Sequence, residues 1–236
     1  MLVCVDKIAV DVADFMRTPK VSHRGGAELG LPVLHFESLD ASTVGWCRDW
    51  RAEIRMTDLA ADASAIPVTV GAVDFVLVQV GEGARSVADH LAALGPRESR
   101  FGELFDGGEL EGELDEHTEF CDGMPIFTVL LVVDAIVDDL MPASRLRPWS
   151  VAEVVHTMLP THSGMVVASA LDGAGRPARR LVSAGRLDPD WPDVGLTGIP
   201  GHPGMVGRAT LFTYLDDARA ELGGIPAEVF SLRTGD

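Results

Sequence analysis

The chain has 236 residues, enough for one large domain or two small ones, and 47% of them are hydrophobic while 23% are charged. Its formal net charge of −17 excludes a broadly basic surface, so we do not expect it to bind nucleic acid. No apolar run reaches the roughly 18 residues of a membrane span, and the charged N-terminal stretch does not resemble a signal peptide. The three cysteines have neither metal-ligand nor disulfide-framework spacing: Cys4, Cys47 and Cys121. These features predict a reduced, cytoplasmic protein that has no membrane span and no metal.

Residues 1–64 are the least regular part of the sequence. We expect residues 1–30 to form an irregular extension and Pro32 to open the first ordered element, a short strand over Pro32–Ser38. The segment Thr43–Leu59 is compatible with either a strand or a helix. No clear linker separates this part from residues 65–236, which hold the main α/β unit, so we expect one continuous domain.

The segment Ile66–Gly83 is rich in valine and predicts two adjoining strands that break near Gly71. A short helix should follow, because Ser86 and Asp89 have capping-box spacing and Gly95-Pro96 ends the pattern. The Gly81-x-Gly83 turn between them imitates the start of a dinucleotide-binding loop but lacks its third glycine, so we predict a plain strand-to-helix turn. The acidic segment over residues 103–122 predicts a solvated surface, with a docking surface for a basic partner as the alternative.

Continuous apolar residues over 126–137 predict a buried central strand. A helix over residues 148–159 follows, with Ser150 and Glu153 at capping-box spacing and with an apolar face of period 3.6 made of Val151, Val154, Val155, Met158 and Leu159. Residues 164–170 predict the next strand, and this βαβ order requires the two strands to be parallel. Residues 172–208 should be long loops around a short helix near Trp191. The segment Arg208–Gly223 could be a strand, a helix or one followed by the other.

Asp134 interrupts the central apolar strand. A buried carboxylate is costly unless it is paired or hydrogen-bonded, so its presence needs a cause. One interpretation is an ion pair with an arginine or a bond from a neighbouring backbone N–H; the other is a proton acceptor whose pKa is raised by burial. The histidines give weaker evidence of a functional site. His156 and His162 have no third metal ligand nearby in the sequence, and His202 lies in a rigid, exposed loop.

A basic turn, Pro142–Pro148, connects the central strand to the helix. Turns that bind phosphate at this place in α/β proteins are usually rich in glycine, because the backbone N–H groups must approach the phosphate closely. This turn has no glycine and carries Arg145 and Arg147 instead.

The order of central strand, basic turn, helix starting near Trp149, parallel strand and then the segment Asp190–Leu196 resembles the GCN5-related N-acetyltransferase (GNAT) superfamily. The resemblance covers roughly residues 65–215 and rests mainly on 126–168. It implies a mixed, twisted central sheet flanked by helices and an acyl-CoA-dependent N-acyltransferase that acts on a small-molecule or peptide amine, alone or as a homodimer.

The resemblance also implies roles for particular residues. Asp134 would accept the proton of the amine, directly or through water, and the backbone N–H groups near Ile136 and Val137 would polarise the thioester carbonyl. The pyrophosphate of acetyl-CoA, or of another acyl-CoA, would lie at the turn and at the start of the helix, formed by Arg145, Leu146, Arg147, Pro148 and Trp149.

The turn departs from the family pattern. Pro142 and Ala143 stand where the family has Arg-Gly, and Arg147 stands where it has a glycine that leaves space for the pyrophosphate. Arg145 and Arg147 could compensate with bidentate phosphate contacts. The single tyrosine, Tyr214, lies past the position of the family's general acid. The alternatives are therefore a GNAT-fold binding or scaffold protein that has lost acetyl-CoA binding, or a different reaction on the same fold.

Overall fold

The structure is a computed structural model, and it describes residues 9–39, 44–60, 66–81, 86–115, 125–142, 145–169 and 190–233. Its helices and strands are, in chain order, β1 (Val10–Asp11), α1 (Val12–Met16), α2 (Pro19–Arg24), β2 (Gly26–Ser38), β3 (Cys47–Asp58), β4 (Val68–Gln79), α3 (Val87–Leu94), α4 (Pro96–Ser99), the 3-10 helix η1 (Arg100–Leu104), β5 (Phe105–Asp106), β6 (Glu109–Leu110), α5 (Gly112–Asp115), β7 (Thr128–Val137), α6 (Leu146–Met158), β8 (Gly164–Ser169), α7 (Asp190–Asp193), β9 (Thr197–Gly198), β10 (Met205–Ala209), α8 (Tyr214–Leu222), η3 (Ile225–Ala227) and β11 (Phe230–Arg233).

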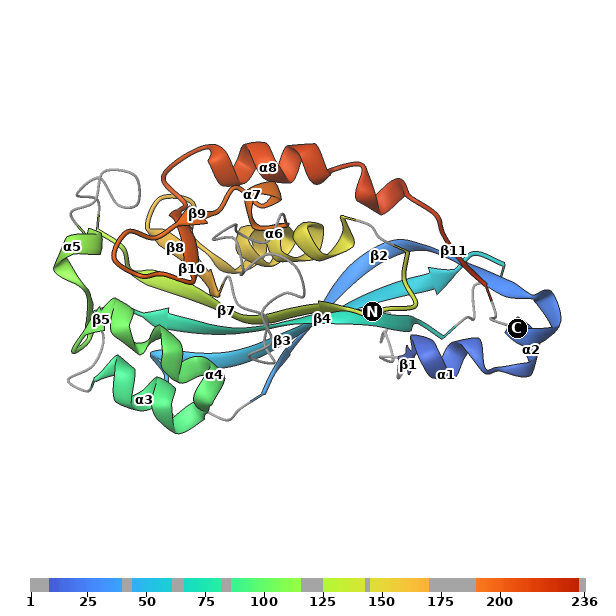
Figure 1. Cartoon of the computed structure of the whole chain (residues 1–236), viewed down its shortest axis with the longest axis horizontal. Helices are drawn as coiled ribbons and strands as arrows, with labels where there is room; N and C mark the ends of the chain where they lie inside the picture. Colours follow the sequence, from blue (N-terminus) through green and yellow to red (C-terminus); the bar gives the residue numbers. More distant parts are fainter. Residues whose placement is uncertain are drawn as a thin grey trace, which may run out of the picture.

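One large mixed sheet runs along the molecule (Figure 1). Its strand order is β11-β2-β3-β4-β7-β8-β10-β9, and β1 lies beside β4. Strands β2, β3, β4 and β7 are antiparallel neighbours, β7 and β8 are parallel, and β10 is antiparallel to β8. The expectation of a mixed α/β fold with a large sheet flanked by helices is therefore confirmed.

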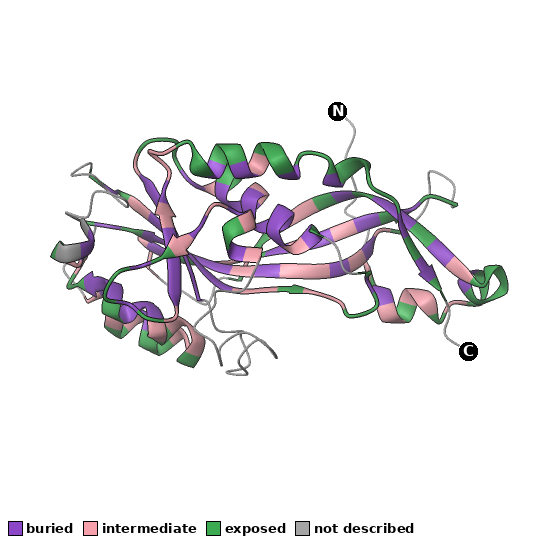
Figure 2. Ribbon diagram, turned by 45° about the horizontal axis from the view of Figure 1, so that its top comes forward, coloured by how far each residue is buried: buried purple, intermediate pink, exposed green. Residues whose placement is uncertain are grey.

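Helices cover the two faces of the sheet unevenly (Figure 1). Helices α6, α7 and α8 lie over one face, and the other face carries α3 and α4 toward one end and α1 and α2 toward the opposite end. One core cluster joins α6, α7 and α8 to the sheet, and a second joins α3 and η1 to it. In Figure 2 the buried residues follow the strands and the inner side of α6, whereas the outer side of α8 is exposed.

The predicted βαβ unit is confirmed with small shifts at its ends. The central strand is β7, the helix is α6, and the following strand is β8. The two strands pair in parallel from Thr128 opposite Gly164 to Val132 opposite Ala168. The capping prediction is wrong, because α6 begins at Leu146. Ser150 therefore lies inside the helix, fully buried, and its hydroxyl donates to the carbonyl of Arg147 at 2.8 Å.

The N-terminal part is more regular than expected. Residues 9–30 include α1 and α2, and β2 begins at Gly26, ahead of Pro32. Pro32 lies within β2 where the register with β3 shifts between Gly30 and Val33, a position that tolerates a residue without a backbone donor. The undecided segment after it is a strand, β3. Residues 1–8 lie outside the described ranges.

Strand β4 is one strand, so the predicted break near Gly71 is wrong. A Cβ atom at Gly71 would lie 2.3 Å from the carbonyl oxygen of Ile136 on β7. Glycine is present here because the neighbouring backbone comes close, and the strand continues through it.

Of the other predictions for the chain after β4, some are confirmed and others are not. Helix α3 is confirmed: the Ser86 hydroxyl accepts from the N–H of Asp89 at 3.2 Å, and the helix ends at Gly95. The acidic segment is only partly a solvated surface, because it buries an apolar side made of Leu104, Phe105, Leu110 and Leu114. Its residues 116–122 and Gly83 of the glycine turn lie outside the described part of the chain. The short helix near Trp191 is present as α7, but the prediction of loops up to residue 208 is wrong, because β9 and most of β10 lie there. The segment Arg208–Gly223 holds the end of β10 and then α8.

Candidate functional site

The parallel strands β7 and β8 separate partway along β7. Among the described residues their pairing ends at Val132 opposite Ala168, whereas β7 continues to Val137. The first part of β7 is almost wholly buried, but from Asp134 onward its residues are partly or fully exposed, and Ile136 is 57% exposed. Among the described residues, no strand pairs with the second half of β7 on the side of β8.

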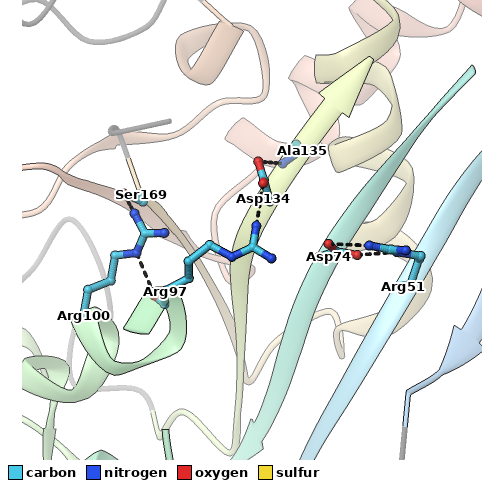
Figure 3. A network of polar contacts seen from close by, with 7 residues as sticks. All are labelled: Arg51, Asp74, Arg97, Arg100, Asp134, Ala135 and Ser169. Atoms are coloured by element: carbon cyan, nitrogen blue, oxygen red, sulfur yellow. Dashed lines mark hydrogen bonds and ion pairs between the residues drawn. The ribbon is translucent and has the colours of Figure 1, made fainter. Parts of the chain in front are cut away.

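A β-bulge lies at the point of separation. Asp74 of β4 pairs with Asp134, whereas the next residue, Phe75, pairs with Val132, so Val133 is an extra residue on β7. Val132 belongs to the core cluster around α6, and Val133 belongs to the cluster around α3. Regular alternation would turn Asp134 back toward α6, but the bulge turns its side chain toward α4 (Figure 3).

The carboxylate of Asp134 has two protein partners (Figure 3). Arg97 Nη1 lies 2.7 Å from its Oδ2 atom, and the backbone N–H of Ala135 donates to Oδ1 at 2.9 Å. The side chain is 13% exposed. Burial raises the pKa of Asp134, and the carboxylate of Asp74 raises it further, while Arg97 and the N–H of Ala135 act in the opposite direction. The group is therefore paired, as one interpretation required, and also more basic than an exposed aspartate.

Arg97 and Arg100 span the gap between the separating strands (Figure 3). Arg100 donates from Nε to the carbonyl of Arg97 at 2.7 Å and from Nη1 to the hydroxyl of Ser169, the last residue of β8, at 2.8 Å. Burial lowers the pKa of Arg100, and the charge of Arg97 lowers it further. Sequence reasoning missed both arginines. The available signal was their spacing of three residues directly after the predicted helix stop, which places both on one side of a further helical turn.

Asp134 also ends a row of charged residues that crosses four strands. Glu37 of β2 is opposite Arg51 of β3, Arg51 is opposite Asp74 of β4, and Asp74 is opposite Asp134. Arg51 holds Asp74 with two hydrogen bonds of 2.7 and 2.9 Å (Figure 3). The two neighbouring aspartates therefore each have an arginine of their own, which reduces their mutual repulsion.

In an antiparallel pair of strands, successive backbone N–H groups point alternately toward and away from the neighbouring strand. This alternation determines which N–H groups of β7 point away from β4. The N–H of Asp138 donates to a carbonyl of β4 at 2.9 Å, so Ile136, two residues earlier, directs its N–H toward β4 as well. The N–H groups of Ala135 and Val137 point the other way, and that of Ala135 is bonded to Asp134. Of the two residues predicted to polarise a carbonyl, Val137 is the one whose N–H is directed to the opening.

The two arginines of the basic turn are both engaged by helix α7. Arg145 Nε lies 3.0 Å from the carboxylate of Asp193, and Arg147 Nε lies 2.5 Å from that of Asp190. The Arg147 guanidinium also lies over the ring of Trp191, 5.9 Å from its centre. The turn and the Asp190–Leu196 segment, which the sequence singled out separately, are thus joined by two ion pairs.

The remaining residues of the predicted cofactor site belong to the core. Leu146 is fully buried, Pro148 is buried, and Trp149 is 5% exposed. Ala143 and Ser144 of the turn lie outside the described ranges. So does the chain's other concentration of arginines, Arg176, Arg179 and Arg180.

The three histidines singled out in the sequence differ in how far they are buried. His156 and His162 are exposed or partly exposed, whereas His202 is 9% exposed, contrary to its expected place in an exposed loop. Its Nε2 atom lies 2.8 Å from Glu111 and its Nδ1 atom 3.6 Å from Glu103, so the acidic segment is docked onto it. In the part of the chain that the structure describes, no group of three or more histidine, cysteine or carboxylate side chains is placed to bind a metal ion.

Comparison with known proteins adds no relative. A scan against models of protein families, a search of curated proteins and a search of solved structures each gave no match. Within the described ranges, no helix is both long enough and apolar enough to cross a membrane.

Proposed function

We propose that the protein is an acyl-CoA-dependent N-acyltransferase that acts on a small-molecule or peptide amine. The observation that carries the proposal is the separation of the parallel strands β7 and β8 at Asp134. At that point a largely buried carboxylate of raised pKa lies three residues from Val137, whose backbone N–H is directed away from β4.

These groups have complementary roles in acyl transfer. The amine nitrogen attacks the thioester carbonyl carbon, and its proton passes to Asp134, directly or through water. Negative charge develops on the carbonyl oxygen, where the N–H of Val137 can donate a hydrogen bond. The C–S bond then breaks, and the CoA thiolate leaves and takes up a proton. Arg97 holds the Asp134 carboxylate in place throughout.

The order of the elements also supports this proposal. A central strand, a basic turn, a helix and a parallel strand follow one another as β7, the turn, α6 and β8, which is the order on which the resemblance to GNAT proteins rests. The pyrophosphate of the acyl-CoA would be held by Arg145, Arg147 and the first turn of α6. An anion at that place is favoured by the partial positive charge of the helix N-terminus.

A second candidate is a binding or scaffold protein that has lost the acyl-CoA. The ion pairs of Arg145 with Asp193 and of Arg147 with Asp190 favour it, because both guanidinium groups already have carboxylate partners. A phosphate would have to displace these carboxylates or share the arginines with them. The two candidates differ in one measurable property, the affinity for CoA.

Calorimetric titration of CoA and acetyl-CoA, together with thermal unfolding in their presence, tests the proposal. A ligand at about 100 times its dissociation constant adds about 2.7 kcal/mol of stability, a rise of several degrees in Tm for a chain of this length. Binding of both compounds, and acetylation of at least one amine from a panel of small amines and peptides, is expected. Absence of CoA binding at millimolar concentration would leave the scaffold function as the correct one.

A further inference from the structure

A groove lies between α6 and α8. Both helices cover the face of the sheet opposite to α4 (Figure 1). The inner chamber of the groove has a volume of about 180 Å³, and its floor is buried and apolar, formed by Ala152, Val155, Leu159, Val194 and Leu215. A chamber of about 150 Å³ with such walls is large enough to hold benzene. The inner chamber can therefore take an apolar group the size of a six-membered ring.

The mouth of the groove is polar. The exposed side chains of His156, Thr161 and Asp216 line it, together with Arg219. Arg219 also borders an outer chamber of about 600 Å³, which reaches Trp149. The outer chamber continues the groove along α6 and α8.

The charges at the mouth are not balanced. Arg219 donates to both oxygens of Glu153 on α6, at 2.8 and 3.1 Å, so its charge is neutralised within the groove wall. The charge of Asp216, three residues earlier on α8, also raises the pKa of Arg219, so two carboxylates act on one guanidinium. Two carboxylates thus share one guanidinium at the mouth and leave one negative charge uncompensated among the described residues there, in a chain whose net charge is −17.

We infer that this groove binds a small primary amine with an apolar body, such as an arylalkylamine or a branched alkylamine. The apolar body fills the chamber over Val155 and Leu215, and the ammonium group lies at the mouth, beside Asp216. An acid of the same shape would add a further negative charge beside Asp216, and an alcohol would leave the excess negative charge uncompensated.

The site is separate from the proposed acyl-transfer site. Asp134 is turned toward α4, whereas the groove lies on the other side of the sheet, against α6 and α8. Helix α6, which follows the basic turn, lines both chambers of the groove. Trp149, in the first turns of this helix, borders the outer chamber. The inference stands on the groove alone and holds whether or not the chain binds acyl-CoA.

The test uses benzylamine as the probe, with benzyl alcohol and benzoate as matched compounds, titrated into the whole chain at neutral pH. Ligand-to-methyl NOEs in a sample with labelled Val, Leu and Ile methyl groups locate the probe. We expect benzylamine to show NOEs to Val155 and Leu215 and to bind at least threefold more tightly than benzyl alcohol, with benzoate weakest.

Two variants complete the test. Asp216→Asn should lower benzylamine affinity about three- to tenfold without changing that of benzyl alcohol, because only the charged contact is removed. Asp217→Asn makes the same charge change on the next residue of α8, which does not line the groove, and should change neither. Equal binding of the amine and the alcohol, equal effects of the two variants, or NOEs to other methyl groups would each overturn the inference. So would the absence of benzylamine binding.

Discussion

Asp134 on β7 and Arg97 at the start of α4 form an ion pair of 2.7 Å between elements that are 37 residues apart in the sequence. The aspartate reaches Arg97 because the bulge at Val133 turns it out of the α6 face. Arg97 is 42% exposed, so solvent screens its charge, and burial still raises the pKa of Asp134 despite the pair. This balance makes Asp134 available as a base and leads to the first two predictions.

Asp134→Asn should lower turnover by about two to four orders of magnitude, the usual range for the loss of a general base. Stability should change by less than about 1 kcal/mol, because asparagine keeps the acceptor for the N–H of Ala135 and loses only a screened ion pair. Steady-state kinetics and urea denaturation measure the two effects.

The matched control for this variant is Asp74→Asn. Asp74 is directly opposite Asp134 and has its own arginine, Arg51, but it does not face the opening. It should change turnover less than about tenfold, since it acts on Asp134 only through its charge. An Asp134→Asn protein that is strongly destabilised yet keeps its activity per folded molecule would show that the role of Asp134 is structural.

The raised pKa predicts a specific pH dependence of stability. The folded state holds the Asp134 proton more tightly than the unfolded state, so the wild type carries the cost of a buried charge at neutral pH. That cost disappears as the pH falls through the raised pKa toward the ordinary value of 3.8. The free energy of unfolding of the wild type should therefore rise relative to that of Asp134→Asn as the pH is lowered from neutral through the raised pKa and on to the ordinary value. A relative fall on acidification would mean that the ion pair with Arg97 outweighs burial.

The basic turn gives a third prediction. If Arg147 receives the pyrophosphate, it must leave Asp190, so Asp190→Asn should tighten CoA binding about three- to tenfold. Arg147→Ala should weaken it about ten- to a hundredfold, since a charge-assisted bond to phosphate contributes about 1.5 to 3 kcal/mol. Calorimetric titration of CoA into each protein measures both effects.

Arg147→Gly separates the two functional candidates, because it introduces the residue that the proposed resemblance to GNAT proteins implies at this position. A wild type that binds no CoA together with a glycine variant that binds it would show that the turn has lost its ligand. If neither protein binds CoA, and Asp190→Asn does not either, the ion pair of Arg147 with Asp190 is a structural contact of α6 with α7.

The fourth prediction concerns the backbone under the site. Gly71→Ala places a Cβ atom 2.3 Å from the carbonyl oxygen of Ile136, so β4 and β7 must move apart. We expect a loss of about 2 to 3 kcal/mol, which is a fall of about 5 to 10 °C in Tm for a chain of this length. Gly198→Ala in β9 is the control, because its Cβ would meet no atom within 4 Å. Equal Tm values for the two variants would mean that β7 does not approach Gly71 so closely.

The sequence alone determined the βαβ unit. A continuous apolar run is stable as a buried strand, and an apolar face of period 3.6 is stable as a helix packed on a sheet, so both patterns are local signals. The parallel direction of β7 and β8 follows from that order, because a helix between two neighbouring strands carries the chain back to the same end of the sheet. The need of Asp134 for a partner was also predictable, since burying a carboxylate is costly anywhere.

Only the tertiary structure decided where that carboxylate points and what holds it. The direction of Asp134 depends on the register of β7 against β4, and one extra residue at Val133 reverses the side to which everything after it is turned. From the sequence, Gly71 is compatible with a break in the strand or with the close approach of a neighbouring strand. Only the position of Ile136 in the structure distinguishes the two. The partners Arg97, Asp190 and Asp193 come from other elements, and a charge pattern along one chain does not say which opposite charge will lie beside it after folding.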